Sequence, residues 1–221
     1  MEPRIDAQAV ADYLRQTPQF FADYADLMAE IFVPHPHGGH AIPIAERQMI
    51  TLRERNNELE RKLRELIRYG TENDAISEKL HRATLALFVA QDLPTTLAVL
   101  QASLHEDFGV PQVALRLWPG SEDTAGMPEF AAVGDDLRAR ADALAAPYCG
   151  TQAPFESRNW FEAPESCQSF AFLALRTTHT FGLLGLASDD PQRFHAGMGN
   201  VYLIRLAEVA SLALARYLPV A

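Results

Sequence analysis

The chain has 221 residues, of which 48% are hydrophobic, and its formal net charge is -10 at pH 7. This length and apolar content suit one domain with a packed core and an extension. The acidic balance disfavours nucleic acid or anionic lipid as partners, because both require a positive protein surface. The sequence has neither a secretory signal nor an apolar run of the roughly 18–20 residues that span a bilayer. We therefore expect a cytoplasmic protein without membrane contact.

Residues 6–32 are predicted to form short helices that are interrupted at Thr17–Pro18. Apolar side chains recur there at helical spacing: Val10, Tyr13, Leu14, Phe20, Phe21, Tyr24, Leu27, Met28, Ile31 and Phe32. This stripe is too apolar to face water, so we expect it to dock on the chain's own helices or on a partner. The acidic side chains of Asp23, Asp26 and Glu30 disfavour a membrane surface as that partner.

Three histidines, His35, His37 and His40, stand close together in the stretch "VPHPHGGHAIPIAERQ". Imidazole nitrogens are common metal ligands, but no cysteine or acid lies nearby to complete a site. Gly38–Gly39 also makes the segment too flexible to hold a coordination geometry. The sequence therefore predicts a polar loop without a metal, and this loop closes an N-terminal segment of residues 1–42.

Residues 43–91 are predicted to form a long helix with a coiled-coil pattern, either continuous or broken at Gly70–Thr71. Apolar residues and one asparagine recur at heptad spacing in its first half: Met49, Leu52, Asn56, Leu59, Leu63 and Leu66. Glu58 precedes Lys62 by four residues, as on the exposed face of a coiled coil. We expect this seam to join two copies of the chain, the competing possibility being that the C-terminal helix covers it.

Residues 92–221 contain the elements of a mixed domain. We expect a helix ending at Gly109, a strand over 111–120, a second strand over 128–134, a helix over 135–150, an irregular stretch over 153–166, a hairpin over 167–190 and a helix over 193–218. The two hairpin strands are almost continuously apolar rather than alternating. This pattern predicts a sheet that is covered on both faces.

Two arginines interrupt the apolar strands and are the candidate ligand-binding residues. Arg116 lies within "VALRLW" and Arg176 ends "FLALR". Together with Trp118 and Trp160 they would suit a planar or anionic ligand in a concave site on one face of the sheet. The alternative is that both arginines face solvent or pair with surface acids.

Catalytic motifs are weak throughout the sequence. The stretch "GMGN" at Gly197–Asn200 lacks the third glycine of a dinucleotide-binding fingerprint, and neither a zincin motif nor a nucleophile elbow occurs. Cys149 and Cys167 could serve a thiol enzyme, but we place Cys149 at a helix C-terminus, where the helix dipole raises a thiol pKa. We predict no catalytic residue and no cofactor.

Several stretches resemble the bacterial domain-of-unknown-function 484 family: "VPH", "ERQ", "LRERN", "YCG" and "GLLGLASDDPQRFHAGMG". The resemblance implies an α+β fold, with a GAF-like antiparallel sheet flanked by helices behind a long coiled-coil-type helix. GAF-like domains are mostly dimeric regulatory or small-molecule-sensing modules, so the resemblance implies a non-enzymatic homodimeric sensor. The alternatives are a protein-interaction scaffold with a filled pocket and a thiol-dependent free-methionine-sulfoxide reductase.

Overall fold

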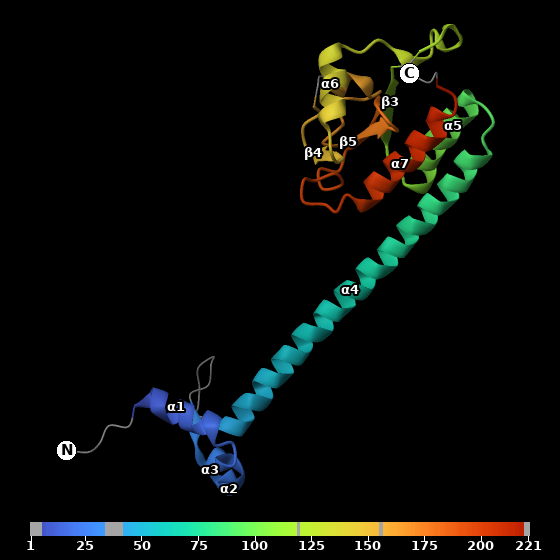
Figure 1. Ribbon diagram of the computed structural model, residues 1–221. Helices are drawn as coiled ribbons and strands as arrows, with labels where there is room; N and C mark the ends of the chain where they lie inside the picture. The colour runs from blue at the N-terminus through green and yellow to red at the C-terminus, as the bar shows by residue number, and fades with distance from the viewer. Residues whose placement is uncertain (1–5, 34–41, 119, 155–156, 219–221) are drawn as a thin grey trace. The chain divides into compact units, whose positions relative to one another are not determined.

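The computed structural model describes residues 6–33, 42–118, 120–154 and 157–218 (Figure 1). The chain divides into two compact units, Met1–Gly70 and Thr71–Ala221, which are described separately below. The division falls within a helix, and the domain boundaries expected after residues 42 and 91 stay predictions. The three histidines of the predicted loop lie outside the described residues.

The first unit begins with short helices, as the sequence predicts. They are α1 (Ala7–Gln16), α2 (Phe20–Asp23) and α3 (Ala25–Glu30), followed by the two-residue strands β1 (Phe32–Val33) and β2 (Ile42–Pro43), which pair antiparallel. Asp6 caps α1 by accepting a hydrogen bond from the Gln8 backbone N–H. Helix α1 ends at Gln16 with Thr17 as its C-cap, so the predicted interruption is confirmed. The rings of Phe20 and Tyr24 stack with centroids 4.9 Å apart.

Helix α4 (Ile44–Val89) is continuous and passes through Gly70 and Thr71 without a break. The predicted exterior pair is present, because Lys62 Nζ lies 2.7 Å from Glu58 Oε1. Asn56 Nδ2 donates a hydrogen bond to Glu60 Oε1 along the helix. The five apolar seam side chains are 53–67% exposed: Met49, Leu52, Leu59, Leu63 and Leu66. The seam is therefore apolar and open to solvent in a single chain.

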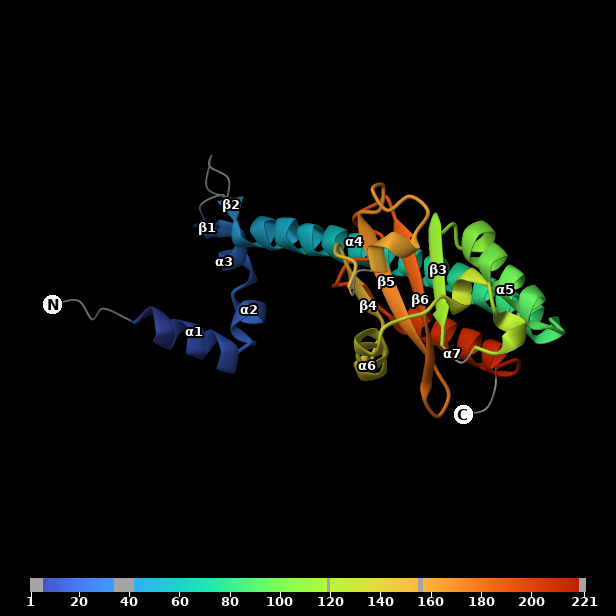
Figure 2. The same cartoon turned by 90° about the horizontal axis from the view of Figure 1, so that it is seen from above.

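The second unit contains a four-stranded antiparallel sheet in the order β3-β6-β5-β4 (Figure 2). Its strands are β3 (Gln112–Leu117), β4 (Tyr148–Gly150), β5 (Ser169–Arg176) and β6 (Thr180–Ser188). Its helices are the last part of α4, α5 (Leu93–Ala102), η1 (Ser103–Asp107), α6 (Asp135–Ala143) and α7 (Val201–Ala215). The predicted α+β class, with helices flanking an antiparallel sheet behind a long helix, is confirmed.

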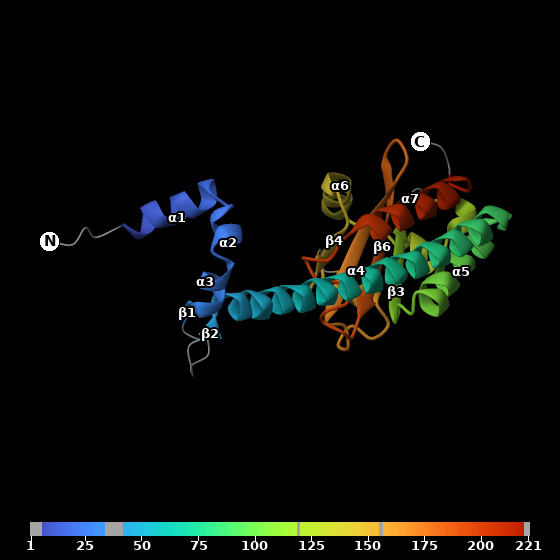
Figure 3. The ribbon, with the colours of Figure 1, turned by 90° about the horizontal axis from the view of Figure 1, so that it is seen from below.

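Both faces of the sheet are covered, as the continuously apolar hairpin predicts. On one face the helices α4, α5 and α7 pack in a layer (Figure 3), and Leu87, Leu104 and Leu214 join Leu173 and Leu184 of the sheet in one core. We call this the helix-face core. The opposite-face core contains α6, the segment before β5 and the other side of the sheet: Ala114, Ala141, Phe161, Cys167, Phe170, Phe172, Leu183 and Ala187.

Helix α7 packs beside the last part of α4. The Tyr202 hydroxyl donates to the Asn73 carbonyl oxygen at 3.0 Å, and Arg216 donates to the carbonyl oxygens of Leu87 and Ala90. These contacts lie at both ends of α7, so the two helices run parallel. Within the second unit α7 therefore lies alongside the last part of α4.

Three predicted elements differ from the structure. The helix predicted over 193–218 begins only at Val201. Residues 128–134 do not form a strand: Pro128 has no N–H for a ladder, and it opens the short helix η3 (Pro128–Phe130), which closes with the Ala131 N–H donating to the Pro128 carbonyl oxygen. The helix predicted over 135–150 ends at Ala143, and the sequence "YCG" pairs with Phe170–Phe172 as β4. Cys149 therefore lies on a strand rather than at a helix C-terminus.

Asp92 caps α5 and supplies a pH-dependent prediction. Its Oδ1 accepts the Thr95 N–H at 2.7 Å, and hydrogen bonds from Thr95 hold the pKa of Asp92 below its ordinary value. A lowered pKa in the folded state means that the cap stabilises the protein above the ordinary pKa and loses this effect as the pH falls through the folded value. We expect Asp92→Ala to lower the melting temperature at pH 7, with the difference from the parent shrinking in acid.

Asp92→Asn is the matched control, because asparagine caps about as well as aspartate but does not titrate. It should melt near the parent at pH 7. Calorimetric scans between neutral and acidic pH measure all three proteins. Equal melting of the Ala variant and the parent at pH 7 would contradict a stabilising cap.

Candidate ligand-binding site

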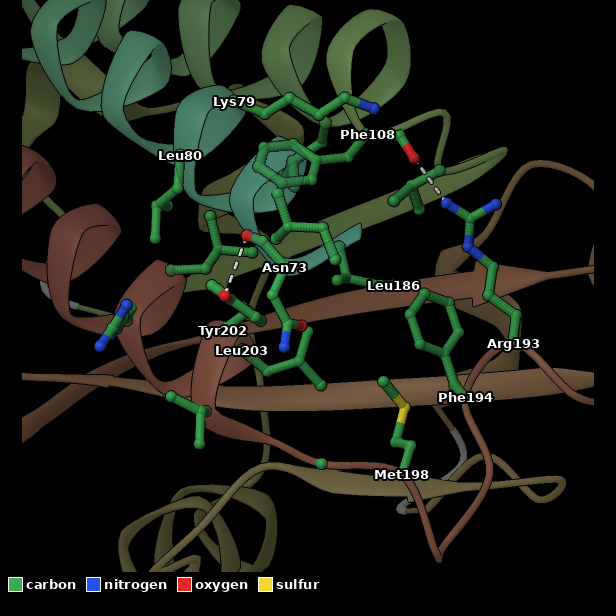
Figure 4. Close-up of a pocket in the computed structure, with 17 residues that line it drawn as sticks. Asn73, Lys79, Leu80, Phe108, Leu186, Arg193, Phe194, Met198, Tyr202 and Leu203 are labelled. Carbon is green, nitrogen blue, oxygen red and sulfur yellow. Dashed lines mark hydrogen bonds between the residues drawn. The ribbon is translucent and has the colours of Figure 1, made fainter. Parts of the chain in front are cut away.

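A cavity of about 630 Å³ lies in the second unit, between the last part of α4, the start of α7 and the loop that follows β6 (Figure 4). Its apolar walls continue the helix-face core, because Leu104 and Leu186 are each 1% exposed and Phe194 is buried. The described residues that line it are Asn73, Ile76, Lys79, Leu80, Leu104, Phe108, Val110, Leu186, Arg193, Phe194, Met198, Gly199, Val201, Tyr202, Leu203, Arg205 and Leu206.

The charged groups among the described residues of this cavity are all cationic. Lys79, Arg193 and Arg205 line it, and none of its described lining residues is acidic. Arg193 is fixed, since its Nη2 donates to the Phe108 carbonyl oxygen at 2.6 Å (Figure 4). Lys79 and Arg205 form no ion pair within the part of the chain that the structure describes. An apolar chamber with unpaired cations suits an anionic group carried on an apolar body.

The sequence does not predict this cavity, because its walls come from four separated segments of the chain. The sequence contains one signal: Asn73 occupies a heptad position, and the equivalent positions seven residues before and after it are the leucines Leu66 and Leu80. In the structure Asn73 lines the cavity, and its carbonyl oxygen accepts the Tyr202 hydroxyl, which also lies 3.2 Å from Ser77 Oγ. Asn73, the polar residue in the heptad repeat, thus lies where α4 lines the cavity.

The four predicted ligand-binding residues do not form one site. The guanidinium of Arg116 lies 5.1 Å from the ring centroid of Trp160, so these two are brought together. Trp118 Nε1 instead donates to the Thr180 carbonyl oxygen. Arg176 donates to the carbonyl oxygens of Ala141 and Leu144 and borders a separate cavity of about 240 Å³.

The sheet face that carries these four residues is largely filled by aromatic side chains. Phe170 and Phe172 are fully buried there, and Phe161 packs on both of them. The concave site expected on this face is therefore occupied in its centre by the protein's own rings. The 630 Å³ cavity lies on the other face, beneath the helices.

The two thiols are separated by the sheet. Cys149 packs against the helix-face core and Cys167 belongs to the opposite-face core, so they do not form a dithiol pair. Burial raises the pKa of the Cys149 thiol and also that of Cys167. A raised pKa lowers the thiolate fraction, which is the nucleophilic form.

The described residues offer neither a metal site nor a membrane span. They contain no group of three or more His, Cys, Asp or Glu side chains arranged to hold a metal ion. Of the helices within the described ranges, none is long and apolar enough to cross a membrane.

Comparison with known proteins identifies the family. The chain belongs to the family described as "Protein of unknown function, DUF484", whose profile matches residues 2–219. It is 24% identical over 220 residues to the "Uncharacterized protein YigA" of Salmonella typhimurium, with 97% of this chain and 93% of that protein covered.

Two solved structures are also similar to the chain. One is the GAF domain of an Acinetobacter phosphoenolpyruvate-protein phosphotransferase, with a TM-score of 0.45, 14% identity and coverage of 63% of this chain and 92% of that one. The other is the GAF domain of the corresponding protein from Coxiella burnetii, with a TM-score of 0.47, 15% identity and coverage of 64% and 93%.

Proposed function

We propose that the protein is a non-enzymatic, homodimeric sensor of the GAF type, in which the second unit binds a small anionic molecule with an apolar body. The observation that carries this proposal is the cavity of about 630 Å³ with apolar walls, three cations and no acidic group among its described lining residues. Its size falls within the usual range of small-molecule sites, about 300–1,000 Å³.

Helix α4 supplies a physical connection between the ligand and the dimer. Asn73, Lys79 and Leu80 line the cavity, and the same continuous helix carries the exposed seam. The heptad register does not change between the two parts: the d positions are Leu52, Leu59, Leu66, Asn73, Leu80 and Leu87. The first three are exposed, whereas Leu80 and Leu87 are 8% and 1% exposed in the helix-face core. A ligand that shifts or stiffens α4 at the cavity would therefore act on the pairing of the seam.

Two alternatives fit the structure less well. A function as a scaffold with a filled pocket is consistent with the aromatic side chains that fill one face of the sheet. It does not explain the cationic cavity on the other face. A thiol reductase requires accessible thiols with lowered pKa values, whereas burial raises the pKa of both Cys149 and Cys167. We therefore favour ligand sensing.

The anion preference can be tested with a simple pair of probes. We expect 4-phenylbutyrate to raise the melting temperature of the protein more than 4-phenylbutyramide, which has the same ring and chain without the charge. The carboxylate can form charge-assisted hydrogen bonds with Lys79 and Arg205, which lack ion-pair partners among the described residues. In the double variant Lys79→Met/Arg205→Met, which keeps only Arg193 of the three cations, the difference between the two probes should shrink markedly, as measured by differential scanning fluorimetry.

The matched control is Lys62→Met/Arg138→Met, which also removes two cations but leaves the cavity lining unchanged. This control should keep the full difference between acid and amide. Equal stabilisation of the parent by both probes would contradict an anion-selective cavity.

A further inference from the structure

Glu129 has a buried carboxylate oxygen without a partner. Its Oε2 accepts no hydrogen bond in the part of the chain that the structure describes. Glu129 belongs to η3, which packs against β3, the strand at one edge of the sheet. A buried, unpaired carboxylate oxygen is costly unless a donor reaches it. It is therefore suited to a donor that comes from outside the chain.

Arg116 lies on β3, and it lines the same small cavity as Glu129. Its guanidinium is placed over the Trp160 ring, and Nη1 donates to the Leu115 carbonyl oxygen at 2.8 Å. This is its only hydrogen bond within the described residues, so most of its N–H donors have no protein acceptor. Burial lowers the pKa of Arg116, and the charge of Glu129 opposes that shift, which places the two charges near one another. No ion pair joins them in the described structure.

The cavity between these groups is small, about 250 Å³, and its remaining walls are mostly aliphatic. Gln101 and Glu162 complete its polar lining. The apolar lining consists of Leu97, Leu100, Val113, Ala114, Leu115, Pro128 and Leu184, with Trp160 at one side. A cation and an anion held apart above an aliphatic wall complement a small molecule that carries both charges and a branched apolar side chain.

We propose that this cavity is a second ligand site, which binds a free aliphatic α-amino acid with its ammonium group on Glu129 and its carboxylate on Arg116. The site shares no lining residue with the 630 Å³ cavity, and it pairs opposite charges where that cavity has only cations. It lies at the outer edge of β3, and it stands or falls independently of the function proposed above.

Titration calorimetry of the full chain with L-leucine tests the proposal. The comparison ligands are 3-methylbutylamine, which lacks the carboxylate, and 4-methylpentanoate, which lacks the ammonium group. We expect L-leucine to bind and each comparison ligand to bind at least about tenfold more weakly, because each loses one charge-assisted contact. Glu129→Gln and Arg116→Met should each weaken L-leucine about tenfold to a hundredfold.

The variant Lys79→Met/Arg205→Met is the control for the other cavity and should bind L-leucine as the parent does. Loss of L-leucine binding in that control would show that L-leucine binds in the 630 Å³ cavity, and it would overturn the second site. The proposal is also overturned if L-leucine, L-isoleucine and L-valine all fail to bind the parent, or if the amine or the acid alone binds as tightly as L-leucine. The comparison ligands are measured on the parent, so the test holds even if Arg116→Met does not fold.

Discussion

Replacing both Leu59 and Leu66 with Asp is expected to convert a dimer into a monomer. Both leucines are more than 60% exposed in the single chain, and they stand seven residues apart on the apolar seam of α4. A paired coiled-coil seam would bury the two introduced carboxylates, at a cost of several kcal/mol for each unpaired charge. Light scattering coupled to size exclusion should report two chains for the parent and one for the double variant.

The control introduces the same two charges away from the seam. Thr51→Asp/Asn57→Asp places both aspartates on exposed positions of α4 that the heptad assigns to the exterior. This protein should remain a dimer. A parent that is folded and monomeric at micromolar concentration would show that the seam does not join two copies, and the dimeric sensor would lose its support.

Phe172→Ala is expected to cost about 3–5 kcal/mol of unfolding free energy, the usual range for removing a buried aromatic ring. Phe172 is 0% exposed on β5, and its ring meets those of Trp160 and Phe161 edge-on, each with centroids 6.2 Å apart. Gly185 on β6 leaves room for the ring, since a Cβ there would lie 2.9 Å from Phe172 Cε1. Alanine would leave a cavity that these neighbours cannot close.

Phe88→Ala makes the same chemical change on the surface, because Phe88 is 78% exposed. We expect it to alter the unfolding free energy by no more than about 0.5 kcal/mol. Urea unfolding of parent and both variants, followed by circular dichroism, measures the difference. Similar small losses at Phe172 and Phe88 would contradict the opposite-face core as a tightly packed cluster.

Periodic features of the sequence predicted the fold well. The apolar runs on either side of Thr177–Thr180 correspond to β5 and β6, and the heptads correspond to α4. The period of the apolar residues reports local structure directly, so these elements can be predicted from the sequence. Two short segments could not be predicted in this way, because "PEFAAVG" and "YCG" are too short to show a period. Pro128 opens a short helical turn in the first, and pairing with β5 makes the second a strand.

The candidate sites are harder to predict from the sequence than the fold, because a site depends on contacts between distant segments. Arg116 and Arg176 stand out in the sequence because each interrupts an apolar strand, but spacing along two strands does not show which groups share a cavity. The structure places Arg116 with Trp160 and Glu129, and Arg176 elsewhere. Glu129 itself gave no signal, since a single acid after a proline is ordinary in sequence, and only its buried oxygen distinguishes it.

Native mass spectrometry of the protein purified gently from its own cells can show whether it is a dimer that carries a small molecule. We expect a mass of two chains, with an anionic small molecule bound to each. Met198 lines the cavity, so Met198→Trp should fill the space and remove that molecule while the dimer persists. A parent that carries no small molecule, or a Met198→Trp variant that carries as much as the parent, would contradict ligand sensing by this cavity.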